Sequence, residues 1–240
     1  MLIDEADVFI RREIVEDYPT LSHFRNLSEE GQCYFIIAGF WDLYEAAVLN
    51  YHSPIKNFGE SITIGALELE ACWKLAIEPM KMLGIDYAKE ELIEQIIIKT
   101  RQRANLMATV CDEMLKNLPA EAQVLTKKEI ICALKNQAIS EALGGWSQLT
   151  DDKQAACLDR IIVYATVKKG KFKLSEIMTL LDQYQYDYTT EQLMQSLTRL
   201  ELAFIIRRDE ESIYHYCVPL FREMLLRQEV DRLLKHEFLN

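Results

Sequence analysis

Two adjacent carboxylates, Asp4 and Glu5, follow the apolar residues 1–3 at the start of the sequence. Apolar residues that stop at acidic ones are typical of the end of a buried strand. Both carboxylates are candidate catalytic groups, and Asp4 is a candidate metal ligand. The alternative is a pair of solvated carboxylates that cap a helix.

Short strands and helices are expected around these carboxylates. The sequence begins inside the first strand, and the apolar run 33–38, which stops at Gly39, predicts a second parallel strand. The segment 8–25 predicts a helix and a loop interrupted at Pro19. Alternation over 61–64 favours a third short strand.

Helices dominate from position 67 onward. Apolar residues recur at helical spacing, and Thr126 with Glu129 fits a helix start in which each side chain bonds the other residue's backbone. Gly144 and Gly145 are expected to end the last helix of this group. The predicted helices cover 68–83, 89–99, 104–118 and 130–143.

The last ninety or so residues predict three helices followed by a hairpin, which together make a winged helix. The charged run 207–211 separates two alternating strands and supplies the turn. A final amphipathic helix is expected over 220–236. The other predicted helices cover 151–166, 174–183 and 190–200, and the predicted strands cover 203–206 and 213–218.

Composition limits the possible partners and compartments. A net charge of −11 repels phosphate backbones, so DNA would need a local basic patch. The six cysteines are scattered and read as reduced core residues, and neither they nor the four histidines have metal-ligand spacing. The longest apolar stretch, 34–41, is far too short for a membrane span and no leader precedes it, so the cytoplasm is the expected compartment.

An ordered series of segments resembles the part of bacterial ATPases of the AAA and STAND type that follows their Walker B motif. The segments are IIAGFWDLYEAAV (36–48), SPIKNFGESITIGALELEACWKLAIEPMKMLGI (53–85) and KTRQRANLMATVCDEML (99–115). In those proteins a sensor strand, a last sheet strand, a helical lid and a winged helix succeed one another. The resemblance covers nearly the whole chain and is most specific over 33–115.

The resemblance implies roles for individual residues. Asp4 and Glu5 would be the Walker B pair, in which the aspartate orients a Mg²⁺ ion and the glutamate polarises the water that attacks the phosphate. ATP and Mg²⁺ would be cofactors of the complete protein. Gly39 would end the sensor strand, although the sensor position is not obviously polar here. Arg101, Arg103 and Asn105 lie where relatives approach the nucleotide from the lid, so they are candidate ATP contacts; solvated helix-start residues are the alternative.

The phosphate-binding loop is missing from the 240 residues. That loop needs G-x-x-x-x-G-K followed by Ser or Thr, and Gly170-Lys171 is followed by Phe172 without the earlier glycine. We therefore expect no tight ATP binding and no hydrolysis by this chain alone. The sheet would also have two open edges, which favours protein partners or self-association through residues 1–64.

The predicted fold is mainly α, with a partial α/β P-loop NTPase core (1–66), a helical lid and connector (67–148) and a C-terminal winged-helix domain (149–240). The predicted function is the carboxy-terminal part of a regulatory ATPase whose nucleotide state moves the lid and winged helix. The alternative is a DNA-binding regulator. Its recognition helix would offer Gln192, Gln195 and Arg199, beside a basic cluster of Lys168, Lys169, Lys171 and Lys173. No Ser, Cys or His arrangement supports another class of enzyme.

Overall fold

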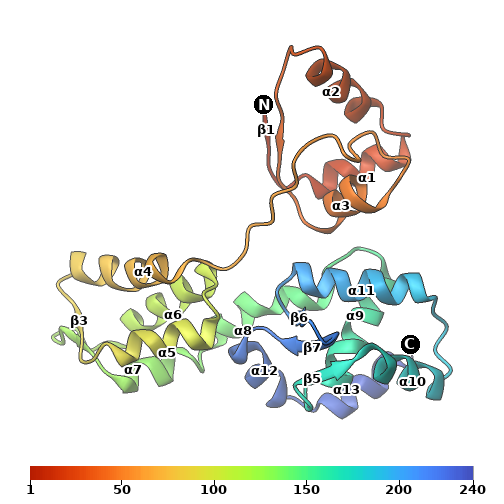
Figure 1. Ribbon diagram of the computed structural model, residues 1–240. Coiled ribbons are helices and arrows are strands. Elements are labelled where there is room, and N and C mark those ends of the chain that lie inside the picture. The colour runs from red at the N-terminus through yellow and green to blue at the C-terminus, as the bar shows by residue number, and fades with distance from the viewer. Residues whose placement is uncertain (240) are drawn as a thin grey trace. The chain divides into compact units, whose positions relative to one another are not determined.

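The computed structural model describes residues 1–239 and is mainly helical, as the sequence predicts (Figure 1). Its contacts divide the chain into two units, Met1–Ile64 and the residues from Gly65 onward. Each unit has its own hydrophobic core. Among residues 1–239, no helix is both long enough and apolar enough to cross a lipid bilayer.

The first unit is built around a two-stranded parallel sheet, in which Leu2 pairs with Ile36 and Ile3 with Ile37. Helices fill the connection between the strands, because parallel strands need a crossover. Buried side chains such as Ile10 and Leu21 form its core. The elements are β1 (Leu2–Ile3), α1 (Asp7–Val15), α2 (Pro19–Glu29), β2 (Ile36–Ile37), α3 (Trp41–Tyr44) and a π-helical turn (Glu45–Leu49).

Two predictions for the first unit are wrong. Residues 61–64 form no strand, since no neighbouring strand among the described residues bonds to them, and Ile62 and Ile64 are exposed. Pro19 begins α2 instead of interrupting a helix, because the first helical position needs no backbone N–H. The start of α2 is capped from a distance, where the buried Glu13 carboxylate accepts the Leu21 N–H at 2.8 Å.

The second unit opens with a group of packed helices. The predicted capping box at Thr126 is confirmed, with the Lys128 N–H on Thr126 Oγ1 at 3.2 Å and the Thr126 N–H on Glu129 Oε2 at 2.9 Å. The elements are α4 (Leu69–Met82), β3 (Asp86–Tyr87), α5 (Glu91–Thr100), α6 (Ala104–Asn117), β4 (Val124–Leu125), α7 (Lys127–Ala133), α8 (Gln137–Gly144) and a 3₁₀ turn (Gly145–Gln148); β3 and β4 pair in parallel.

The rest of the second unit combines helices with a three-stranded antiparallel sheet of order β5-β7-β6. The predicted hairpin forms as β6 and β7, but its first strand covers 206–208 instead of 203–206, so Arg207 and Arg208 lie in the strand and not in the turn. Phe172 of β5 stacks on Tyr214 of β7 at 5.2 Å between ring centroids. The elements are α9 (Lys153–Thr166), β5 (Lys171–Lys173), α10 (Leu174–Gln183), α11 (Thr190–Leu202), β6 (Ile206–Arg208), β7 (Ile213–Tyr216), α12 (Pro219–Leu226) and α13 (Val230–Glu237).

Two predicted helices are each divided in the structure. The segment 130–143 breaks at Asn136, whose side chain accepts the Ala138 N–H at 3.0 Å and so starts α8. The segment 220–236 breaks between α12 and α13. All six cysteines are free thiols, and Cys132 is exposed instead of lying in the core.

A bidentate ion pair joins the two ends of this last region. Arg160 of α9 donates to both carboxylate oxygens of Glu237 in α13 at 2.8 Å, and its third nitrogen donates to the Ser147 carbonyl at 3.1 Å. Partial burial acts to raise the pKa of Glu237, but the Arg160 guanidinium outweighs it and holds that pKa below its usual range. The pair therefore stabilises the fold only while Glu237 is ionised.

We expect Glu237→Gln to lower the free energy of unfolding by about 1–2 kcal/mol at pH 7, because it removes a charge-assisted hydrogen-bond pair. A carboxylate with a depressed folded pKa stabilises fully above its unfolded pKa, about 4.3, and loses that contribution as pH falls through the folded value. Urea denaturation from pH 7 down to pH 3 should therefore show the wild-type advantage shrinking. Glu229→Gln, at an exposed pair with Arg232, is the control; equal losses for both variants at pH 7 would contradict the prediction.

Candidate functional site

Asp4 and Glu5 lie directly after β1, at the carboxyl end of the parallel sheet. Both side chains are exposed, and Asp4 Oδ1 accepts the Glu5 N–H at 2.9 Å. Glu5 has a left-handed backbone with φ 51°, a conformation that costs a non-glycine residue free energy. The chain then returns to the sheet, where the Ala6 N–H bonds to the Ala38 carbonyl at 2.9 Å.

A third carboxylate, Asp7, holds the end of the neighbouring strand. Its Oδ2 accepts the Phe40 N–H at 2.6 Å, and its Oδ1 accepts the N–H groups of Asp42 and Leu43 at 2.8 and 3.3 Å. These are the free donors at the start of α3. A methyl group on Gly39 would lie 2.8 Å from Asp7 Oδ2, so only glycine leaves room for this approach. Asp7 lies in the run D-E-A-D, but its role as an acceptor appears only once β2 and α3 lie beside it.

This strand end fits a Mg²⁺ ion only together with a phosphate ligand. Carboxylate oxygens suit this hard cation, which usually takes one or two protein carboxylates and completes its octahedron with water and phosphate. Within residues 1–239, no cluster of three or more His, Cys, Asp or Glu side chains could hold a metal alone. Asp7 is occupied with backbone donors, which leaves the exposed carboxylates of Asp4 and Glu5 as the available ligands.

The other three predicted site residues lie in the second unit, near the junction of α5 and α6. Arg101 is exposed and caps the end of α5 with a left-handed φ of 51°. Arg103 is half-buried, donates to the Ala203 carbonyl at 3.4 Å, and has its pKa lowered by desolvation. Asn105 bonds within its own helix start, accepting the Leu106 N–H at 2.9 Å.

The prediction that Arg199 could read a DNA groove is wrong. Arg199 is 2% exposed and donates to Asp159 of α9 from Nε at 2.7 Å and from Nη2 at 2.9 Å. Ser196 donates to the same carboxylate. Gln192 is also engaged, because its side chain accepts the Thr189 N–H that begins α11. The outer face of α11 therefore presents no cation.

The basic cluster before α10 is also partly neutralised. Lys168 pairs with Asp231 at 2.5 Å, and Lys169 pairs with Glu176. Lys171 and Lys173 are exposed on β5. Two of the four lysines are therefore ion-paired within the chain.

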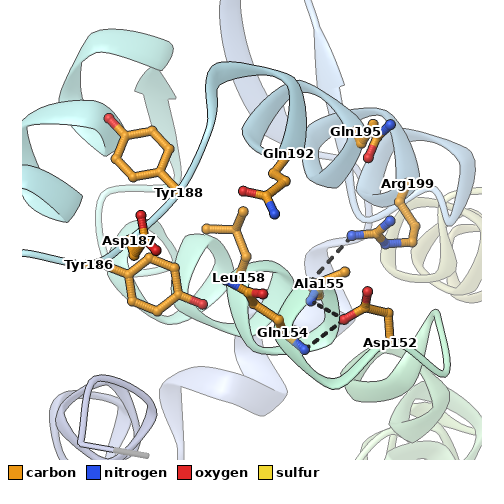
Figure 2. Close-up of a pocket in the computed structure, with 10 residues that line it drawn as sticks. All are labelled: Asp152, Gln154, Ala155, Leu158, Tyr186, Asp187, Tyr188, Gln192, Gln195 and Arg199. Carbon is orange, nitrogen blue, oxygen red and sulfur yellow. Dashed lines mark hydrogen bonds between the residues drawn. The ribbon is translucent and has the colours of Figure 1, made fainter.

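A cavity of about 140 Å³ lies between α9, α11 and the segment that precedes α11 (Figure 2). Figure 2 shows Asp152 bonded to the backbone at the start of α9, with Gln192 and Gln195 across from it. The cavity is much smaller than the roughly 300–1,000 Å³ of typical small-molecule sites. Its Asp152 and Arg199 side chains are already used to hold α9 and α11, so we assign it no ligand.

Comparison with solved structures identifies a protein that shares this fold. No protein-family model and no curated protein matches the sequence. Among solved structures, a Walker-type ATPase of Pyrococcus abyssi matches with a TM-score of 0.66 and 15% sequence identity, over 94% of this chain. The chain spans 62% of that protein's length. At this identity the match shows that the chain shares its fold with that structure, and it carries over no residue roles.

Proposed function

We propose that this chain works as the carboxy-terminal part of a regulatory P-loop ATPase of the AAA or STAND type. The observation that carries the proposal is the parallel β1–β2 pair, with Asp4 and Glu5 at its carboxyl end. Ligands of open α/β sheets bind outside the carboxyl ends of the strands, so we expect a nucleotide to bind beside these carboxylates. The fold shared with a Walker-type ATPase supports the same assignment.

Each carboxylate at the strand ends would have its own role in the proposed chemistry. Asp4 would hold Mg²⁺, which supplies charge neutralisation at the ATP phosphates when bound. Glu5 would orient a water molecule, and Asp7 would keep the end of β2 and the start of α3 in place. Arg101, Arg103 and Asn105 are the proposed lid contacts to nucleotide. Without a glycine-rich loop and its lysine, the chain alone would lack most phosphate contacts, so we expect weak ATP binding and no hydrolysis.

We propose that residues 67–148 act as a helical lid and connector, and residues 149–240 as a winged-helix module. The order α9-β5-α10-α11-β6-β7, with β7 central in the sheet, is typical of a winged helix. In the complete protein, the nucleotide state would move the lid and this module to pass a signal.

Protein partners or self-association are proposed at the first unit. Among the described residues, β1 and β2 bond only to each other, so each has an edge without a neighbour. Large apolar side chains beside these edges are exposed, and unpaired strand edges favour pairing with another chain. The exposed residues are Met1, Leu2, Tyr34 and Ile36.

DNA binding through the winged helix is the second candidate. The exposed Lys171 and Lys173 favour it, because they present two cations from one strand. The outer face of α11 carries the exposed Glu191 and no cation, and Arg199 is buried, so a recognition helix has little with which to read bases. Protein binding is therefore the better supported role for this module.

Paramagnetic broadening by Mn²⁺ in the presence of ATP tests the proposed nucleotide edge. The amide signals of Asp4 and Glu5 should broaden first, and Asp4→Asn should remove most of that effect because it removes the metal-binding charge. Asp17→Asn is the matched control, since it removes an exposed carboxylate after the far end of α1. Broadening that survives Asp4→Asn, or that centres away from β1, would overturn the assignment.

A further inference from the structure

A second concave region lies wholly within the second unit, between the end of α5 and the β6–β7 hairpin. Its volume is about 280 Å³. Ile97 and Ile98 line it on the α5 side, followed by Arg101 and Gln102. Arg207 of β6 and Cys217, just after β7, line the hairpin side. Two guanidinium groups from distant parts of the sequence therefore share one pocket.

Neither arginine has a carboxylate partner among the described residues. The neighbouring cations are engaged: Arg103 donates to the Ala203 carbonyl, and Arg208 donates to Ser212 Oγ at 2.6 Å. Lys99 pairs with Glu223. A chain with 38 acidic and 27 basic residues thus leaves two arginines unpaired at one place. Two like charges at one pocket repel each other, and an anion between them would relieve that repulsion.

The pKa of the Cys217 thiol depends on the charged side chains around this pocket. Burial raises its pKa, and so does the negative charge of Glu201. The positive charges of Arg207, Arg101 and Arg103 lower it. Three cations and one carboxylate are therefore close enough to influence the same sulfur. The balance at the pocket is positive.

The backbone that carries Arg101 is strained. Arg101 and Gln102 are consecutive non-glycine residues with φ of 51° and 61°, both in the left-handed region. Such strain persists only where the surrounding structure enforces it, and it concentrates at functional positions. Here the Gln102 carbonyl accepts the Leu67 N–H at 2.9 Å, and the Gln102 N–H bonds to the Ile97 carbonyl at 3.2 Å. These bonds hold the turn that places Arg101 at the pocket.

We propose that this pocket binds a small phosphate-bearing ligand between Arg101 and Arg207. The planar guanidinium presents paired N–H donors that match phosphate oxygens, and Arg is favoured for such recognition. The volume lies just below that of typical small-molecule sites, so the pocket fits a phosphate or pyrophosphate group with a small body. The ligand would link α5 to the hairpin. Arg101 is also one of the proposed lid contacts, but the second unit forms this site alone. Pyrophosphate binding here and Mn²⁺ broadening at Asp4 can therefore fail separately.

Alkylation of Cys217 in the full chain tests the proposal. Iodoacetamide is neutral, and mass spectrometry resolves the labelling rate of each cysteine. Pyrophosphate should slow labelling of Cys217, both by covering the thiol and by raising its pKa, while exposed Cys132 keeps its rate. Separate titrations with phosphate, pyrophosphate and ATP distinguish a free phosphate ligand from the phosphates of a nucleotide. Calorimetric titration with pyrophosphate measures the binding directly and does not depend on the thiol.

The variants Arg101→Gln and Arg207→Gln should each weaken pyrophosphate binding about tenfold or more, since each removes charge-assisted hydrogen bonds. Arg208→Gln is the matched control. It lies next to Arg207 on the same strand but does not line the pocket, so binding should be unchanged. Calorimetry without measurable binding would overturn the proposal. The proposal would also be overturned if sodium chloride at equal ionic strength slowed the labelling of Cys217. Equal weakening of pyrophosphate binding by Arg207→Gln and Arg208→Gln would contradict it too.

Discussion

Arg199→Met is expected to lower the free energy of unfolding of the second unit by about 3–5 kcal/mol, the usual cost of leaving a buried charge without its partner. The Asp159 carboxylate is fully buried and accepts two hydrogen bonds from Arg199 and one from Ser196. Methionine fills similar space but donates nothing, so the carboxylate would stay buried and charged. Urea denaturation at pH 7, followed by circular dichroism, measures the loss.

The pH dependence and a double variant separate this mechanism from simple misfolding. Burial raises the pKa of Asp159 against the lowering effect of Arg199, and removing Arg199 raises it further. A protonated Asp159 costs less to bury, so the deficit of Arg199→Met should shrink as pH falls through the raised pKa. Adding Asp159→Leu should recover much of the stability, because both charges are then gone. Arg232→Met, at an exposed pair, should cost less than about 1 kcal/mol. A loss at Arg199 as small as that at Arg232 would contradict the prediction.

Asp7→Ala is expected to destabilise the first unit by about 2–3 kcal/mol, since one carboxylate satisfies three backbone donors at the start of α3. The loss should be local. Hydrogen exchange of the Phe40, Asp42 and Leu43 amides should speed up before that of α1, because their acceptor is gone. The end of β2 would then lose its fixed position beside Asp4.

Two further variants make the Asp7 result specific. Asp7→Asn keeps an acceptor oxygen but loses the charge, so it should fall between wild type and Asp7→Ala. Asp17→Ala removes an exposed carboxylate and should leave exchange at α3 unchanged. Unaltered protection of Phe40 and Asp42 in Asp7→Ala would show that the cap contributes little.

Local signals explain which parts of the fold could be predicted from the sequence. The sequence predicts helix α10 at its observed bounds, because its apolar residues recur at helical spacing. The capping box at Thr126 was predicted because both partners lie within one turn. The β6–β7 hairpin is predicted by its alternating strands and the charged residues between them, although β6 begins later in the sequence than predicted and includes Arg207 and Arg208. In each case the decisive residues are neighbours in sequence.

Features that depend on distant contacts were missed. The strands β3 and β4 have two residues each and exist only because Asp86 meets Val124. The role of Asp7 needs β2 to return beside β1 before its acceptors become useful. The buried state of Arg199 depends on Asp159 in another helix, so its spacing on α11 suggested a groove-reading residue instead. Asp4 and Glu5 were placed correctly after a strand, but their proposed chemistry remains a prediction.

The parallel pairing of β1 with β2 also has a consequence for how fast this protein acquires its structure. Leu2 pairs with Ile36 only after the whole intervening segment has closed into a loop. Closing that loop costs chain entropy before the pairing of the two short strands can stabilise the fold. Contacts between neighbouring helices, such as those of α6 with α7, form over much shorter separations. Folding should therefore start among the helices that follow Gly65, and the sheet that carries Asp4 should be completed late.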